Sequence, residues 1–264
     1  MPLVAENLKQ WEHAYEWDTA GDEWSEPWGG SHMMWTHCIY PRIRKHIPAN
    51  VILEIAPGHG RWTNYLKEYA QELHLVDLSA NCIQACQKRF ADADNIHYYV
   101  NNGYDLAAIP DGSVDFVFCF DSLVHVDLDC LSSYIQEIGR ILAENGTAFI
   151  HHSNLAYHKR NPAYYYYKHA YDRIFRRVPP NRFFKKKLFN SWRGSTVSYQ
   201  KVKEVCHQNN LYCEIQELID WHSGSYLKDC ITTISRNADA EEIVIKNRNF
   251  MTHAALIKGL DIYT

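Results

Sequence analysis

The chain has 264 residues, 46% of them hydrophobic, which is enough for one sizeable core and near the upper length for a single domain. Its 27 basic and 31 acidic side chains leave a net charge of −4, which argues against general affinity for nucleic acid. No targeting signal begins the chain and no window approaches a membrane-spanning length, so we expect a cytoplasmic protein. The eight cysteines form no Cys-x-x-Cys pair, which predicts reduced core residues.

The first 49 residues are rich in tryptophan. Leu8, Trp11 and Tyr15 recur at helical intervals, a loop with Trp24 and Trp28 follows, and a second helical stretch covers about 32–46. One interpretation is an amphipathic helix that packs on the core. The other is a lid over a cationic ligand, because cations are attracted to aromatic faces. The two interpretations are compatible.

Residues 51–66, VILEIAPGHGRWTNYL, have the strongest pattern in the chain. The first five form an apolar run typical of a buried parallel strand. Pro57, Gly58 and Gly60 then predict a tight turn, and residues 61–69 have helical spacing. Such a strand, glycine turn and helix start direct backbone N–H groups toward a ligand. The stretch therefore predicts a nucleotide-type binding site.

The spacing of small residues distinguishes two kinds of nucleotide site. A dinucleotide fingerprint is not met, since Thr63 stands where its third glycine belongs. The template acidic-x-small-x-Gly-x-Gly fits residues 54–60, with Ala56 replacing a glycine. A second strand over 73–76 ends in Asp77, 77 − 58 = 19 residues after Gly58, where an acid can accept hydrogen bonds from both ribose hydroxyls.

On these residues the chain resembles the class I S-adenosylmethionine-dependent methyltransferases. The resemblance implies S-adenosylmethionine as cofactor and an α/β fold with a doubly wound, mainly parallel seven-stranded sheet. The alternative is an ordinary strand–helix turn in which Asp77 caps a helix. For Asn102 an Asn-Gly turn is the alternative. The cofactor-binding residues that the resemblance implies are Glu54, Ala56, Gly58, Gly60, Trp62, Asp77, Leu78, Asn102, Gly103, Phe120, Asp121 and Ser122, with Trp28 from the lid.

The remaining elements alternate regularly along the chain. We expect a helix capped by Ser79, strands over 96–100 and 114–120, a helix over 128–142 that is capped by Asp127 and stopped at 145–146, and a fifth strand over 147–151. This order predicts right-handed crossovers in a parallel sheet. A helix over 198–209, an antiparallel pair over 211–221 and 230–235, and a helix over 250–257 complete the chain.

Three histidines are candidates for the base that a hydroxyl acceptor requires. His125 follows the fourth strand, and His151 and His152 end the fifth, where their side chains point in opposite directions. We slightly prefer His152 over His125, and a structural role is the alternative for each. Asp121, Asp127 and Asp129 have no diagnostic metal-ligand spacing, so we expect no metal.

A basic segment separates the fifth strand from the last helices and strands. It has eleven Lys or Arg between Lys159 and Arg193 against one acid, Asp172. These cations could hold a phosphate while a tyrosine run supplies stacking surfaces. The alternatives are a solvated helix face or a subunit interface of a possible homodimer. The candidate acceptor-binding residues are Tyr164, Arg173, Arg176 and Arg177.

We therefore expect residues 1–49 to form a lid and residues 50–264 a methyltransferase domain with an acceptor-binding insertion over 155–197. The phrases LEIAPGHGRW, PDGSVDFVFCFDSLVHV and FIHHSN look like bacterial sugar- and glycan-modifying O-methyltransferases. This resemblance implies methylation of a sugar hydroxyl in a nucleotide-linked or phosphorylated glycan precursor. The alternatives are methylation of another small metabolite, an aromatic hydroxyl or an amine, and a cofactor-binding scaffold without chemistry.

Overall fold

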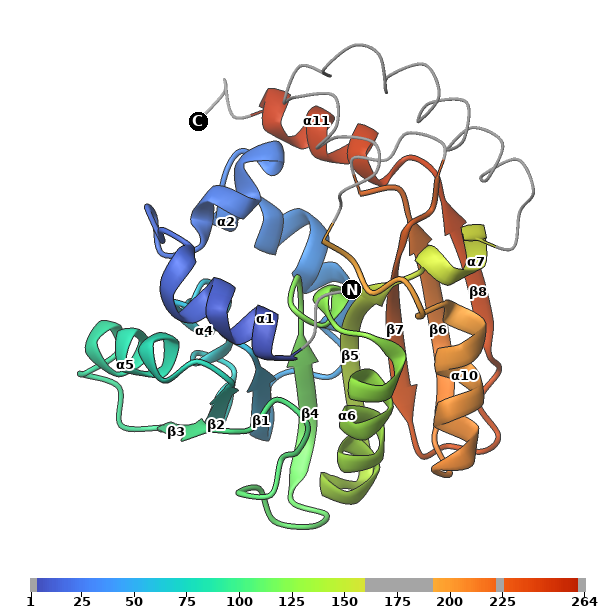
Figure 1. The fold of residues 1–264 in the computed structure, drawn as a ribbon, viewed down its shortest axis with the longest axis horizontal. Coiled ribbons are helices and arrows are strands. Elements are labelled where there is room, and N and C mark those ends of the chain that lie inside the picture. The colour runs from blue at the N-terminus through green and yellow to red at the C-terminus, as the bar shows by residue number, and fades with distance from the viewer. Residues whose placement is uncertain (1–3, 160–191, 222–225, 261–264) are drawn as a thin grey trace.

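A computed structural model describes residues 4–159, 192–221 and 226–260, which form an eight-stranded mixed sheet with helices on both faces (Figure 1). The strand order is β3-β2-β1-β4-β5-β7-β6-β8. β7 is antiparallel to both of its neighbours, and the other neighbouring strands are parallel. The strands are β1 (Ala49–Ile55), β2 (Ala70–Asp77), β3 (Ile96–Val100), β4 (Val114–Cys119), β5 (Leu142–Ser153), β6 (Tyr212–Ile219), β7 (Asp229–Ser235) and β8 (Ile243–Asn247).

Helices cover the two sheet faces unequally. One face carries α6 and α10, whose buried side chains join those of β4 and β5 in one core cluster. The other face carries α2 and α3 together with α4, α5 and α11. The helices are α1 (Val4–Lys9), α2 (Ser31–Met34), α3 (Tyr40–Ile43), α4 (Thr63–Leu66), α5 (Ala80–Arg89), α6 (Leu128–Ile141), α7 (Leu155–Lys159), α10 (Tyr199–Gln208) and α11 (Phe250–Leu260).

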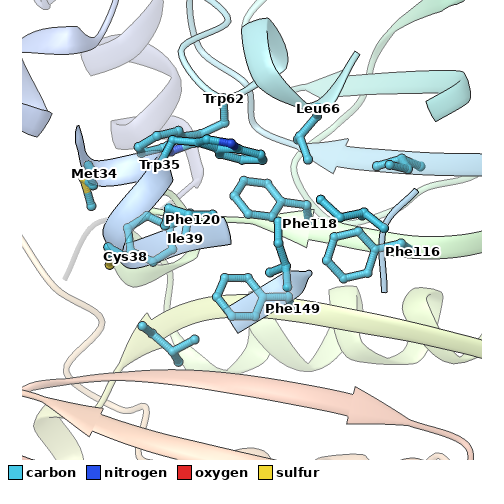
Figure 2. Close-up of a cluster of buried hydrophobic side chains, with 14 of the residues drawn as sticks. Met34, Trp35, Cys38, Ile39, Trp62, Leu66, Phe116, Phe118, Phe120 and Phe149 are labelled. Carbon is cyan, nitrogen blue, oxygen red and sulfur yellow. The ribbon is translucent and has the colours of Figure 1, made fainter. Parts of the chain in front are cut away.

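The N-terminal segment contributes to the core as well as to the surface. Figure 2 shows Met34, Trp35 and Ile39 packed with Trp62 over a row of phenylalanines from β4 and β5. Trp35 and Trp62 have ring centroids 6.3 Å apart. The interpretation that this segment packs on the core is therefore confirmed for residues 34–43. This packing holds the N-terminal segment against the sheet, close to the carboxyl ends of the strands.

Two sequence predictions about the sheet are wrong. The sheet has eight strands rather than seven, because β8 pairs with β6 at an edge and exposes its apolar residues, a pattern that does not indicate a strand. The helix predicted to stop at 145–146 ends at Ile141, and β5 begins at Leu142 instead of 147. Gly146 lies within this strand, where a Cβ would stand 2.7 Å from the Val114 carbonyl oxygen of β4.

Other local predictions are confirmed. Ser79 caps α5 by accepting from the Cys82 N–H at 3.1 Å, and Asp127 caps α6 by accepting from the Cys130 N–H at 3.0 Å. All eight cysteines are buried and free, as expected of reduced core residues. Among the helices that the structure describes, none combines the length and apolarity needed to cross a bilayer.

Candidate active site

A cavity opens at the carboxyl ends of β1, β2 and β4, and the N-terminal segment supplies part of its wall. Its walls are mostly apolar and aromatic, with a few charged groups. Nine of the residues predicted to bind the cofactor line it: Ala56, Gly58, Trp62, Asp77, Leu78, Gly103, Phe120, Asp121 and Ser122. His125 lines the same cavity. Motifs that are far apart in sequence thus meet in one place.

The turn after β1 has the backbone conformation that its glycines predict. Gly58 and Gly60 have φ of 59° and 81°, in the left-handed region. Ala56 also lies there, with φ of 56°, which explains why the family template has a glycine at this position. The Ala56 carbonyl accepts a hydrogen bond from Ser122 Oγ at 3.1 Å, joining this turn to the end of β4.

Glu54 and Gly60, both predicted to bind the cofactor, support the turn and do not line the cavity. Glu54 is buried and accepts from Thr63 Oγ1 at 2.6 Å, which ties β1 to the start of α4. Burial raises the pKa of Glu54 to about 8. At Gly60, a Cβ would come within 2.5 Å of the Phe90 ring. Both residues therefore set the path of the loop.

Asp77 ends β2 and faces the cavity from beside the glycine turn. Its Oδ2 accepts from the Gly58 N–H at 3.1 Å and its Oδ1 from the Ser79 N–H at 2.8 Å. The carboxylate is 7% exposed, and burial raises its pKa to about 6. Each oxygen keeps a second lone pair for a ligand hydroxyl.

Tryptophans of the N-terminal segment line the cavity opposite the strand ends. Trp11, Trp17 and Trp24 all contribute, and Trp17 stacks on the His59 ring with centroids 4.3 Å apart. Trp28, which we expected there, packs in the core instead, with its ring centroid 5.3 Å from that of Phe250. The tryptophan-rich pattern indicated an aromatic wall but could not say which rings would face it.

The same segment is attached to the strand ends by polar contacts. Glu12 accepts a hydrogen bond from Ser79 Oγ beside Asp77. Asn7 donates to the His125 carbonyl oxygen at 3.0 Å and accepts from Trp192 Nε1 at 3.0 Å. Asn7 thus links three segments that are far apart in sequence.

Asn102 is exposed and does not line the cavity, which corrects its assignment to the cofactor. Its side-chain oxygen accepts from the Tyr104 N–H at 2.8 Å, and its amide also bonds Asp105, as in the Asn-Gly turn weighed above. Gly103 in the same turn does line the cavity, with φ of 83°.

Five charged groups form a buried row beside the cavity, and three of them, Arg61, Asp121 and Arg193, line it. Arg61 Nη2 is 2.7 Å from Asp121 Oδ2, and Asp121 Oδ1 is 3.3 Å from His151 Nδ1. On its other side, His151 Nε2 is 3.6 Å from Asp229 Oδ2, which in turn is 3.0 Å from Arg193 Nη2. We call Arg61, Asp121, His151, Asp229 and Arg193 the charged row. It joins the turn after β1 to the ends of β4, β5 and β7.

The pKa values in the charged row favour alternating charges. Burial alone would lower the pKa of His151, but the two neighbouring aspartates raise it. Burial alone would raise the pKa of Asp121, but His151 and Arg61 lower it to about 2. Arg193 and His151 outweigh burial in the same way and lower the pKa of Asp229. The row thus alternates basic side chains with aspartates along its length.

The three candidate histidines have different surroundings. His151 lies within the charged row, and His152 is fully buried with its ring nitrogens bonded to the Ser153 carbonyl and Thr232 Oγ1. Neither lines the cavity, which argues against our preference for His152 as the base. His125 does line it. The expected base thus moves from the end of β5 to the end of β4.

The tautomer of His125 follows from its hydrogen bond. Its Nδ1 bonds the Trp192 carbonyl oxygen, which can only accept, so Nδ1 holds the proton in the neutral ring. Burial, followed by the charge of Arg193, lowers the pKa of His125 to about 3. No described residue bonds its Nε2. The ring therefore offers a free lone pair at neutral pH.

Comparisons with known proteins agree with the fold and with the position of the cavity described above. Residues 52–146 match the family model described as a methyltransferase domain. The chain contains a methyltransferase domain, with S-adenosylmethionine as its cofactor. The matched residues contain the glycine turn, Asp77, the end of β4 and His125. No curated protein matches the chain.

Solved structures similar to this methyltransferase share its fold at low sequence identity. A methyltransferase from Leishmania major gives a TM-score of 0.59 at 9% identity, over 88% of this chain and 82% of that one. Geranyl diphosphate C-methyltransferase from Streptomyces coelicolor gives 0.53 at 14%, over 76% of each chain. The PH0226 protein from Pyrococcus horikoshii gives 0.53 at 16%, over 78% and 91%. At these identities the likenesses establish the class I methyltransferase fold alone.

The cavity wall fits S-adenosylmethionine. Asp77 is placed to accept from ribose hydroxyls, as the resemblance implies. Trp62 has a buried Nε1–H without a partner among the described residues, a donor suited to a carboxylate. Gly58 leaves space beside the Trp17 ring that a Cβ would fill, at 2.6 Å. These residues would hold the cofactor.

Three residues of the charged row have no counterpart in the sequence predictions. Arg61 directly follows the glycine motif and could have been found from its position. Arg193 and Asp229 are far apart in sequence and gave no signal, since only the antiparallel pairing of β7 with β5 brings Asp229 to His151. Tyr164, Arg173, Arg176 and Arg177 lie outside the described residues.

Replacing Gly58 with alanine is expected to weaken S-adenosylmethionine binding by about tenfold or more, because the new Cβ would clash with Trp17 at 2.6 Å. Isothermal titration calorimetry measures the affinity. Gly112→Ala is the matched control, because Gly112 has φ of 61° and nothing within 4 Å of its Cβ position. Both variants lose about 1–2 kcal/mol of stability from the left-handed backbone. Equal cofactor affinities in the two variants would contradict the role given to Gly58.

The charged row also predicts a pH dependence of folding stability. His151 has a raised pKa, so its contribution is present below its ordinary value of 6.5 and is lost as pH rises through the raised pKa. Asp121 and Asp229 have lowered pKa values, so their contributions are present above 3.8 and are lost at lower pH. Urea denaturation of wild type and His151→Gln from pH 5 to 9 measures the difference. We expect it to shrink toward alkaline pH, and a constant difference would count against a charged His151.

Proposed function

We propose that this methyltransferase methylates a sugar hydroxyl of a nucleotide-linked or phosphorylated glycan precursor, with His125 as the proton acceptor. The observation that carries the proposal is a neutral imidazole with a free Nε2 in the wall of the cofactor cavity. When bound, S-adenosylmethionine supplies a methyl group activated by a sulfonium. A hydroxyl is a weak nucleophile, so a base that receives its proton contributes about 10²–10⁴-fold.

The aromatic side chains in the cavity wall favour a small, ring-shaped acceptor. Trp11 and Trp24 from the N-terminal segment and Trp221 after β6 line the cavity together with Phe120. Flat rings present large apolar surfaces that pack on a sugar face and exclude water. We propose that residues 1–49 act as a lid in this sense. Glu12 and Asn7 hold the proposed lid to the strand ends.

Charge supports an anionic acceptor. The two terminal members of the charged row, Arg61 and Arg193, are cations that line the cavity. Arg193 also lowers the pKa of His125. A phosphate near Arg193 would oppose that effect and make His125 a stronger base. Arg193 belongs to the sequence range 155–197, so the described end of the proposed acceptor-binding insertion reaches the cavity.

The test is methyl transfer from labelled S-adenosylmethionine to a panel of matched acceptors. The panel holds nucleotide sugars, sugar phosphates, the corresponding free sugars, catechols and primary amines. We expect product with phosphate-bearing sugars and a higher KM for the free sugars. Transfer only to catechols or amines would refute the sugar assignment and favour the aromatic walls as a pocket for another metabolite. Cofactor binding without transfer to any tested acceptor would favour the scaffold alternative.

Arg193→Gln tests the role of charge within the same panel. We expect KM to rise for the phosphate-bearing acceptor and to change little for the free sugar, because only the former carries an anion. The matched control is Arg236→Gln, an arginine bonded to the Gly139 carbonyl that does not line the cavity. Equal KM changes for both acceptors would contradict an anion site at Arg193.

A further inference from the structure

A second group of chemically active side chains lies on the outer strands, away from the cavity. Parallel pairing of β2 with β3 sets His74 opposite His97. Glu72 precedes His74 by two residues and so lies on the same face of the sheet. One ligand atom from each of Glu72, His74 and His97 lies within 4.8 Å of the other two. None of the three lines the cavity.

His74 is held in one orientation by a second partner. Its Nδ1 is 3.2 Å from Tyr99 Oη, and its Nε2 is 3.6 Å from Glu72 Oε2. The His74 and His97 rings are stacked with centroids 4.9 Å apart. A metal-bound histidine commonly uses its other ring nitrogen for such an orienting hydrogen bond. Tyr99 supplies that bond here, which leaves Nε2 of His74 for an ion.

We propose that Glu72, His74 and His97 bind a divalent transition-metal ion and that Zn²⁺ suits the set best. Two imidazoles and one carboxylate are a ligand set that Zn²⁺ accepts, with water in the fourth position. Glu72 has 59% of its side chain exposed and His74 12%, so an ion can enter from solvent. The site is independent of the proposed acceptor.

A bound ion would tie the edge strand β3 to β2, just before the strand ends that lead to Asp77 and Gly103.

The test uses the full chain after removal of metal with a chelator that is then dialysed away. Calorimetry with ZnCl₂ measures the affinity, and Co²⁺ absorption in the visible range reports nitrogen and oxygen coordination. We expect His97→Ala and Glu72→Gln each to weaken Zn²⁺ binding at this site by at least about tenfold. Both residues are solvent-exposed, so the variants should fold, and an unchanged affinity for S-adenosylmethionine checks that they do.

His253→Ala is the matched control, because His253 is also exposed and lies on α11, remote in sequence from β2 and β3. Loss of one Zn²⁺ site in His97→Ala and Glu72→Gln, with the site retained in His253→Ala, would establish the proposal. Identical Zn²⁺ titrations of wild type, His97→Ala and Glu72→Gln would overturn it. Absence of Zn²⁺ binding to the wild-type chain would overturn it as well.

Discussion

Replacing His125 with glutamine is expected to lower kcat for methyl transfer by about 10²–10⁴-fold. Glutamine can keep a side-chain donor toward the Trp192 carbonyl, but it cannot accept the proton of a hydroxyl acceptor. S-adenosylmethionine affinity should change little, because Asp77 and the glycine turn are untouched. Single-turnover assays at saturating cofactor, with calorimetry for binding, separate the two effects.

His152→Gln is the matched control for this substitution. His152 is fully buried and bonds Ser153 and Thr232, so its loss should reduce stability rather than the rate of transfer. If folded His152→Gln lost activity while His125→Gln kept it, the base would be His152, as the sequence alone favoured. Undiminished transfer in both variants would mean that neither histidine is the base.

Replacing Asp121 with asparagine is expected to destabilise the fold by about 3–5 kcal/mol, the cost of breaking one partner out of a buried ion pair. The substitution leaves Arg61 and His151 without the carboxylate between them. It preserves the backbone, since Asp121 has φ of 68° and asparagine tolerates the left-handed region. The variant therefore isolates the charge.

Denaturant unfolding at pH 6 measures this loss. Asp129→Asn, an exposed acid in the first turn of α6, is the control and should change stability by only about 0.3–1 kcal/mol. Adding His151→Gln to Asp121→Asn removes one cation as well and should recover part of the loss, which a double-mutant cycle quantifies. Equal stabilities of Asp121→Asn and Asp129→Asn would contradict a tightly paired charged row.

The sequence predicted the path of the backbone around the cavity better than it predicted the direction of individual side chains. Gly58 and Asp77 could be placed at the cavity from sequence because their strand, turn and spacing are local features. Glu54 matched the same motif, yet its side chain turned to Thr63. A motif position fixes where the backbone goes, whereas the direction of a side chain depends on neighbours from other elements.

Histidine and tryptophan positions show the same limit. The sequence placed His125, His151 and His152 at strand ends, and all three lie there. The tertiary structure alone places His151 between Asp121 and Asp229 and brings His152 into hydrogen-bond contact with Thr232. Likewise the tryptophan-rich segment indicated an aromatic wall, but Trp28 went into the core while Trp17 faced the cavity.

By itself, the sequence determined the doubly wound fold, the cofactor turn and the acid that ends β2. Each rests on short-range periodicity, turn chemistry and spacing, which one segment carries alone. The tertiary structure decided the eighth strand, the charged row and the histidine that faces the cavity. Those depend on contacts between residues far apart in sequence, such as His151 and Asp229, which are 229 − 151 = 78 residues apart. No local pattern encodes such distances, because they arise only when β4, β5 and β7 lie side by side.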